Sequence, residues 1–188
     1  MNPVADERVL LIDVENVVGP VAPGPEVIRG RVRALIEAAG EPHHVLACYA
    51  PEDPQADRTV SVLAEMRVAT WQVGKATDAA DHALLQHARY LRERGFTTFV
   101  VASADGMFAA LAELGRLEVL VWERQSPSQR LVTAAHAVQR LRLPPRGPVP
   151  APEVPRSPAG PATSLTKSGE TARNRAGPGG GRSPKPRK

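Results

Sequence analysis

The chain has 188 residues, of which 24 are lysine or arginine, 20 are aspartate or glutamate, and one is cysteine. A single cysteine excludes an internal disulfide and a thiolate zinc cluster within the chain. No apolar run approaches the roughly 20 residues of a membrane-spanning helix, and Asp6 and Glu7 near the start argue against a signal peptide, so we expect a cytoplasmic protein with no membrane partner.

The charge is distributed unevenly along the sequence. Residues 1–143 carry 15 basic and 18 acidic side chains, a net charge of −3, whereas residues 144–188 carry 9 basic and 2 acidic ones, a net charge of +7. The second segment also holds 11 of the 19 prolines and no aromatic residue. Such a segment buries too little apolar surface to offset its ordering entropy. We therefore predict a folded domain over residues 1–143 and a disordered, basic, Pro/Gly-rich tail over residues 144–188.

Two interpretations of this tail stay open. A basic tail can hold nucleic acid electrostatically, in which case its contribution to affinity fades as salt is added. It can equally be a solubilising segment without a target.

Within the predicted domain, short apolar runs alternate with segments of helical periodicity. The runs are continuously apolar, as is typical of strands covered on both faces, and they predict strands over residues 9–12, 45–49, 70–73, 99–102 and 119–122. The intervening periodicity predicts helices over residues 27–36, 60–66, 84–91, 108–114 and 131–141. Strands that alternate with helices imply a parallel sheet with right-handed crossovers, so we predict a three-layer α/β domain around about five strands.

Polar side chains follow two of these strands directly. Asp13 and Asn16 come after the first strand, and Ser103 and Asp105 come after the fourth. In an open α/β sheet, ligands bind beyond the carboxyl ends of the strands, near the point where the strand order reverses. If the first and fourth strands are neighbours, Asp13 and Asp105 approach each other. Capping of the segments that follow is the alternative role for both.

Two more aspartates begin the third predicted helix. Asp81 precedes Leu84 and Leu85 by three and four residues, which places it on the apolar face of that helix. Asp78 lies near the helix N-terminus, where we favour a capping role. Carboxylates about 4 Å apart repel by roughly 4 kcal/mol at an effective dielectric constant near 20, so a shared cleft needs a cation, and oxygen ligands suit Mg²⁺ or Mn²⁺.

The same positions resemble three motifs of the NYN domain family of PIN-like nucleases. The segment from Leu11 to Asn16 looks like the opening Asp-x-x-Asn motif. The segment from Lys75 to Leu84 resembles the second motif, a lysine followed by Asp-x-x-Leu, and residues 101–108 resemble the third, usually written Ser-Gly-Asp-x-Asp-Phe. The motifs occur in the family's order, and the resemblance covers most of residues 7–125 and none of the tail.

This resemblance implies a PIN-like α/β/α sandwich that hydrolyses RNA, expected to be single-stranded, with one or two divalent ions that activate water. It implies that Asp13, Asp81 and Asp105 are metal-binding and catalytic, with Mg²⁺ or Mn²⁺ as cofactor, and that Asn16 orients water or a ligand. Ser103 would support the loop by hydrogen bonding. We group Ser103 with Lys75 as candidate substrate-binding residues, where Lys75 either meets phosphate or pairs with Asp78.

Some positions depart from the family pattern. Met107 stands where the third motif has its second aspartate, and His87 stands where a further acid often follows Asp81. The alternative function is therefore a weak or inactive NYN-like domain that binds RNA or a protein. A phosphohydrolase with Asp13 as nucleophile is a third hypothesis, although the Asp-Gly-Thr run of haloacid-dehalogenase-like phosphatases is missing. Without a G-x-G-x-x-G motif or a P-loop, we expect no nucleotide cofactor.

Three aromatic or imidazole positions have competing interpretations. Trp71 and Trp122 lie in predicted strands, where packing in the core or at the sheet edge is favoured over base stacking. His87 is either a contact to phosphate or base or an ordinary surface residue of its helix.

Overall fold

The structure is a computed structural model that describes residues 7–19, 24–51 and 58–145. Helices and strands alternate through most of this part of the chain, and the elements are, in order, β1 (Arg8–Asp13), α1 (Val14–Val18), α2 (Pro25–Ala39), β2 (His44–Tyr49), α3 (Thr59–Glu65), β3 (Ala69–Gln72), α4 (Ala79–Glu93), β4 (Thr98–Ala102), the 3₁₀ helix η1 (Gly106–Glu113), β5 (Arg116–Trp122), α5 (Gln129–Ala134) and β6 (Ala137–Leu141). Nearly all of the predicted tail, residues 146–188, lies outside the described residues, so the domain boundary at residue 143 stays a prediction.

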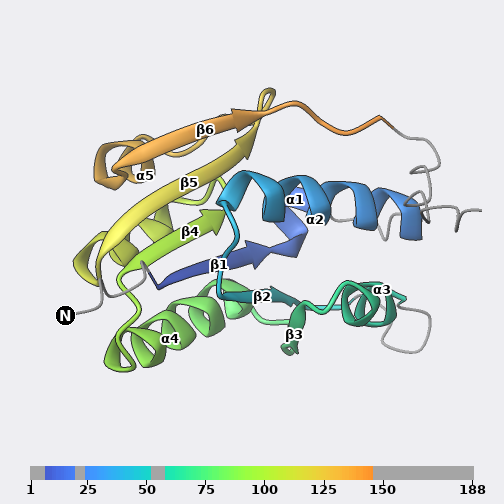
Figure 1. The fold of residues 1–188 in the computed structure, drawn as a ribbon, viewed down its shortest axis with the longest axis horizontal. Coiled ribbons are helices and arrows are strands. Elements are labelled where there is room, and N and C mark those ends of the chain that lie inside the picture. Colours follow the sequence, from blue (N-terminus) through green and yellow to red (C-terminus); the bar gives the residue numbers. More distant parts are fainter. Residues whose placement is uncertain (1–6, 20–23, 52–57, 146–188) are drawn as a thin grey trace, which may run out of the picture. The chain divides into compact units, whose positions relative to one another are not determined.

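The strands form one parallel sheet in the order β3-β2-β1-β4-β5-β6 (Figure 1). β1 lies between β2 and β4, and Ile12 is in register with Ala47 on one side and Ala102 on the other. The chain first builds the sheet outward through β2 and β3, and it then crosses to β4 on the other side of β1. The predicted adjacency of the first and fourth strands is therefore confirmed, and the strand order reverses at β1 and β4.

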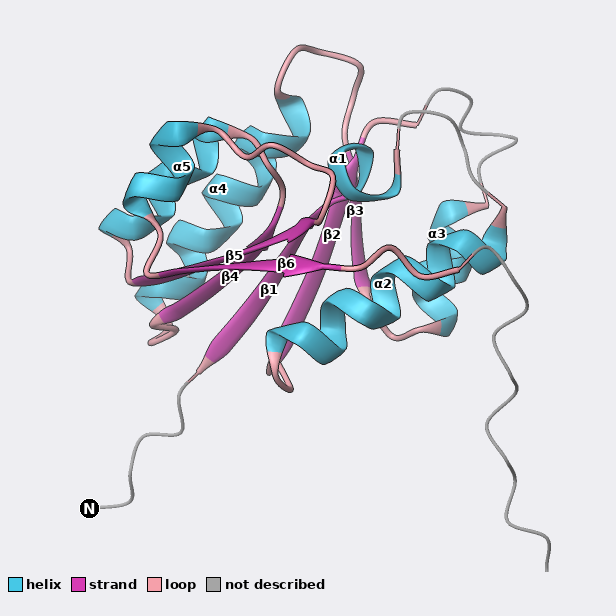
Figure 2. Ribbon diagram, turned by 90° about the horizontal axis from the view of Figure 1, so that it is seen from above, coloured by secondary structure: helices cyan, strands magenta, loops and turns pink. Residues whose placement is uncertain are grey.

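Helices cover both faces of the sheet, which confirms the predicted three-layer α/β/α architecture. Figure 2 shows the sheet nearly edge-on, with α4 and α5 on one side and α2 and α3 on the other. Alternate residues of each strand serve the two sides: Val9 and Leu11 pack in the cluster with α4, whereas Leu10 and Ile12 pack in the cluster with α2. This division explains why the strands are apolar at successive positions.

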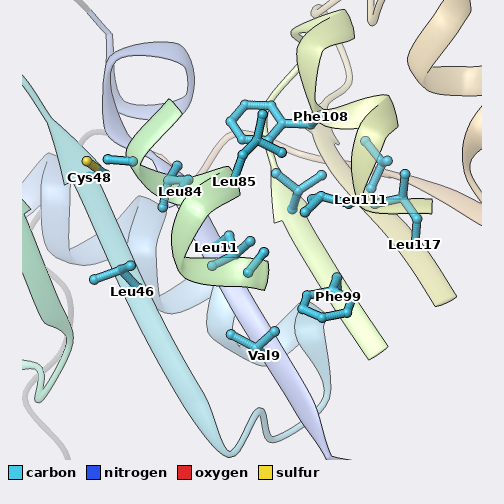
Figure 3. Packing of buried hydrophobic residues seen from close by; sticks show 14 of the residues in the cluster. Val9, Leu11, Leu46, Cys48, Leu84, Leu85, Phe99, Phe108, Leu111 and Leu117 are labelled. Carbon is cyan, nitrogen blue, oxygen red and sulfur yellow. The ribbon is translucent and has the colours of Figure 1, made fainter. Parts of the chain in front are cut away.

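The hydrophobic cluster on the α4 side extends to the end of the sheet where Asp13 and Asp105 follow β1 and β4. Figure 3 shows Leu84 and Leu85 of α4 packed over Leu11 and Cys48, with Phe108 of η1 beside them. Residues at strand ends that share the side of Leu11 therefore project toward α4.

The last predicted helix is wrong in its second half. α5 ends at Ala134, and Ala135 is already extended, with φ −74° and ψ 139°. Val138 and Leu141 instead belong to β6, which pairs with β5 in parallel register. Their three-residue spacing resembled a helix stripe, but the free edge of β5 offered backbone hydrogen bonds that a longer helix would have left unused. The sheet consequently has one more strand than we expected.

Two further local features differ from the expectations. The segment after β4 is a 3₁₀ helix, η1, rather than an α-helix. Directly after Asp13 the chain makes a short helix, α1, that the apolar periodicity did not reveal, and it ends at Gly19 with φ 103°. None of the helices in the described ranges is long and apolar enough to cross a membrane.

Candidate active site

Asp13 ends β1 with its side chain turned toward α4. It has the same strand parity as Val9 and Leu11, and it retains only 6% exposure. Its Oδ1 atom accepts a hydrogen bond from the backbone N–H of Asn16 at 3.3 Å, which caps α1. The capping role considered for Asp13 is therefore present, and it holds the carboxylate at the edge of the sheet.

The loop after β4 is connected to Asp13 through a buried serine. The Ser103 hydroxyl donates to Oδ2 of Asp13 at 2.8 Å and accepts from the backbone N–H of Asp105 at 3.1 Å. Ser103 has no exposed surface, and its hydroxyl is engaged by Asp13 and by the backbone of Asp105, so its grouping with Lys75 as a substrate-binding residue stays a prediction. Its position matches the supporting role that the resemblance implied.

Asp105 caps η1 from this loop. Its Oδ1 atom accepts from the backbone N–H of Met107 at 2.7 Å, and the residue is exposed. The capping alternative is thus also realised for Asp105. Capping occupies one carboxylate oxygen, and a carboxylate has about four acceptor positions, so a cap does not prevent the same group from binding a cation.

The aspartates converge on one pocket of about 680 Å³ at this end of the sheet. Asp13 and Asp105 arrive from the ends of β1 and β4, and Asp78 and Asp81 arrive from the start of α4. Asp78 adopts a left-handed backbone, with φ 56°, and its side chain makes no capping hydrogen bond. Asp78 thus occupies the N-cap position that we expected, but its side chain does not make the expected capping hydrogen bond and lines the pocket instead.

Burial and mutual repulsion raise the pKa of two of these acids, Asp13 and Asp81. Burial raises the pKa of Asp13 to about 6, against the opposing effect of the hydrogen bonds from Ser103 and Asn16. Burial also raises the pKa of Asp81 to about 7, and the charges of Asp13 and Asp105 add to the increase. The described residues donate no hydrogen bond to Asp81, so no donor among them offsets the cost of its charge.

Asn16 joins the three strand ends behind the pocket. Its Oδ1 atom accepts from the backbone N–H of Ala104 at 3.1 Å and from Nε2 of Gln125 at 3.0 Å. Gln125 also donates to the backbone carbonyl of Asn16 at 2.8 Å and accepts from the backbone N–H of Trp122. Sequence reasoning missed Gln125, although a polar residue three positions after the fifth strand is the same signal that identified Asp13 and Asp105.

Other polar residues complete the pocket wall. Lys75 lines it and is exposed, and within the described residues it forms no ion pair with Asp78. Glu15, which follows the first strand but was not among the predicted site residues, also lines the pocket and accepts a hydrogen bond from the backbone N–H of Ala50 at 2.9 Å. Met107, by contrast, packs against the α4-side core, and His87 contacts other rings farther along α4.

The donor chemistry of the pocket fits a hard divalent cation. Carboxylate oxygens are the ligands that such cations prefer, and the raised pKa values of Asp13 and Asp81 indicate carboxylates that lack a positive partner. In the described part of the chain, no three His, Cys, Asp or Glu side chains are arranged so that they could hold a metal ion without rearrangement. Binding would therefore require side-chain rotation or water-mediated contacts, as is common for Mg²⁺.

Comparison with known proteins assigns this arrangement to a family. The model of the NYN domain matches residues 8–141, the span from β1 to β6. No curated protein matches the chain.

Proposed function

The chain belongs to the NYN domain family of the PIN-like superfamily, a group of nuclease-like domains, and on that premise we propose that it is a divalent-metal-dependent endoribonuclease. The observation that carries this proposal is the convergence of Asp13, Asp81 and Asp105 on one pocket. Three acids from distant segments share this site, and burial and repulsion oppose the ionisation of Asp13 and Asp81, which is a costly arrangement unless a cation binds there.

Each side chain has a distinct part in this mechanism. Asp13, Asp81 and Asp105 would hold the ion, which when bound supplies an activated water and stabilises the charge that develops on the phosphate. Lys75 lies on the pocket wall, where its ammonium group can attract the phosphodiester backbone. Asn16 keeps its Nδ2 group for a water or a ligand, because its Oδ1 atom is taken by Ala104 and Gln125.

Ser103 acts through Asp13 rather than on the substrate. Its hydrogen bond favours the ionised form of Asp13 and lowers the pKa of that carboxyl. Because the same hydroxyl accepts from the backbone of Asp105, it also fixes the two acids relative to each other.

The test is cleavage of a labelled single-stranded RNA in Mg²⁺, Mn²⁺ or EDTA. We expect cleavage with either metal and none in EDTA, and we expect Asp13→Asn and Asp105→Asn each to abolish it. Glu93→Gln is the matched control, since Glu93 is an exposed acid at the far end of α4. Cleavage that persists in EDTA or in both aspartate variants would contradict the proposal.

A binding module without cleavage is the second candidate. The observation in its favour is Met107, whose side chain packs against the core where the third motif has an acid. Wild-type protein that binds RNA but cleaves none in either metal would support this candidate over the nuclease.

A further inference from the structure

Four ring side chains from α4, β2 and the edge strand β3 form a continuous cluster. Nε2 of His44 lies 3.0 Å from Nε2 of His87. The His87 ring stacks on Tyr90 with centroids 5.8 Å apart, and Trp71 meets His87 edge-on at 6.3 Å. Arg94 completes the group, with its guanidinium carbon 3.8 Å from the Tyr90 ring centroid. We call these five residues the ring cluster.

Much of the ring cluster is open to solvent. Trp71 is 40% exposed and Tyr90 is 46% exposed. The other large hydrophobic side chains with comparable exposure in the described ranges are aliphatic, and none belongs to this cluster: they are Val60, Val132, Val138 and Leu143. The exposed aromatic surface is therefore concentrated at one place. The two tryptophans for which we expected packing in the core or at the sheet edge differ in exposure. Trp122 is buried in the core, whereas Trp71 lies on the edge strand β3 and stays partly open to solvent.

The ring cluster runs into the acid pocket along two elements. Trp71 is in register with Cys48, which faces α4, so Trp71 lies on the α4 side of the sheet. β3 then leads to Lys75 on the pocket wall. On α4, Ala80 lines the pocket and shares a helical face with His87 and Tyr90, because spacings of seven and three residues return to the same side. Arg94, the residue that ends the helix, follows Tyr90 by four positions.

The chemistry of the ring cluster fits unpaired bases. Flat aromatic faces stack with bases irrespective of sequence, and a guanidinium adds cation–π attraction and a charge for the backbone. Bases within a duplex offer only their edges, so a stacking surface selects single strands. Ala80 and Tyr90 are ten helical residues apart, roughly 15 Å at 1.5 Å per residue, which leaves room for a strand that also reaches the pocket.

We propose that the ring cluster is a stacking platform that holds the bases of single-stranded RNA beside the acid pocket. This inference rests on the proposed function for its choice of RNA, and it specifies which side of the pocket the strand occupies. The backbone would pass Lys75 and reach the aspartates, and bases on one side of the cleaved bond would stack on Trp71 and Tyr90.

The test measures binding in EDTA, so that it does not depend on cleavage. A short oligouridine is titrated into the full chain while tryptophan fluorescence is followed. Of the two tryptophans, Trp122 is 3% exposed, so quenching reports on Trp71. We expect Trp71→Ala and Tyr90→Ala each to weaken binding roughly tenfold, within the range measured for loss of a base–aromatic stack. Affinities of the Trp71 variants are measured by fluorescence anisotropy of labelled oligouridine.

Two variants serve as controls for folding and for general loss of apolar surface. Trp71→Phe retains a ring and should bind oligouridine almost as the wild type does. Val132→Ala removes a side chain of similar exposure, 37%, from α5, and it should leave affinity unchanged. An oligomer with abasic sites should bind the wild type more weakly than oligouridine does. The difference should be smaller for Trp71→Ala, in which Tyr90 alone of the two stacking rings remains.

Several results would overturn the platform. Equal affinity of Trp71→Ala and wild type would do so, as would equal affinity of wild type for abasic RNA and oligouridine. Absence of quenching would do so too, and it would direct the search to a protein that covers the ring cluster. The cleavage assay tests the proposed nuclease function separately. If the wild type cleaves RNA but Trp71→Ala binds oligouridine as tightly as the wild type, the platform alone is refuted. If the bases stack on the ring cluster but no RNA is cleaved, the nuclease function alone is refuted.

Discussion

The hydroxyl of Ser103 donates a 2.8 Å hydrogen bond to the carboxylate of Asp13, across the seam between β4 and β1. The bond exists because the two strands are parallel neighbours in register, so residues that end them on the same face meet. It connects a residue with no exposed surface to an acid that lines the pocket.

Substitution of Ser103 by alanine should change the pH dependence of cleavage. The Ser103 hydrogen bond lowers the pKa of Asp13, so its removal should raise that pKa above about 6. If the ionised carboxylate is the active form, the acidic limb of the pH–rate profile moves to higher pH. Single-turnover rates between pH 5 and 8 would measure the shift. An unmoved limb, with the rate lowered equally at every pH, would indicate that Ser103 supports the loop only.

Asp81→Asn should stabilise the metal-free protein at pH 8. The folded-state pKa of Asp81 is raised to about 7, so its contribution to stability is fully present below the unfolded pKa and is lost as the pH rises through 7. Thermal unfolding in EDTA should therefore show a higher Tm for the variant than for the wild type at pH 8, and little gain at pH 4. Saturating Mn²⁺ should narrow the difference in Tm at pH 8, since the ion should bind the wild type, with all three carboxylates, more tightly than it binds the variant. A variant less stable than wild type at pH 8 in EDTA would contradict the electrostatic account.

Loss of Asn16 should destabilise the fold as well as the site. Asn16→Ala removes the Oδ1 atom that accepts from the backbone N–H of Ala104 and from Nε2 of Gln125, and we expect a fall of about 1–3 kcal/mol in the free energy of unfolding. Gln125→Ala should lower the free energy of unfolding by a similar amount, because it breaks the same network from the segment after β5. Gln129→Ala is the control, since Gln129 is exposed and the one side-chain hydrogen bond that it makes within the described residues goes to the exposed Thr133. Urea titration measures all three, and equal stability of Asn16→Ala and Gln129→Ala would refute the structural role.

Introduction of an acid at Met107 should not raise cleavage. The Met107 side chain packs against the α4-side core, so a carboxylate placed there loses that packing and is partly desolvated. We expect Met107→Asp to lower the free energy of unfolding by about 1–3 kcal/mol and to leave kcat no higher than wild type. A rise in kcat with Mg²⁺ would show instead that the new carboxylate reaches the pocket.

The His44–His87 pair should make stability sensitive to mild acid. Burial lowers the pKa of both imidazoles, and the charge of His44 further lowers the pKa of His87. Both depressed values favour the neutral rings, so the pair's contribution to stability is present above about 6.5 and is lost as the pH falls through the folded-state values. Denaturation of wild type and His87→Gln between pH 7.5 and 5 measures this loss. We expect the stability advantage of the wild type to shrink with acid, and a constant difference would contradict the prediction.

The amino-acid sequence by itself determined the layered fold and the positions of the strand-end acids. Continuous apolar runs such as residues 9–12 and 99–102 require that both faces of the sheet are covered, because successive residues of a strand point to opposite faces. Asp13 and Asp105 follow those runs directly, so local pattern was enough to place them at one edge of a parallel sheet. The family motifs rest on the same local information.

Tertiary structure decided what depended on distant partners. The segment 137–141 forms β6 because β5 has an open edge. Asp78 lines the pocket with a left-handed backbone conformation that the local sequence pattern does not predict. The contacts of Gln125 with Asn16 and of Trp71 with His87 join residues 109 and 16 positions apart. Such pairs arise from strand order and from helix placement on the sheet, and these are properties of the packed chain rather than of any short segment.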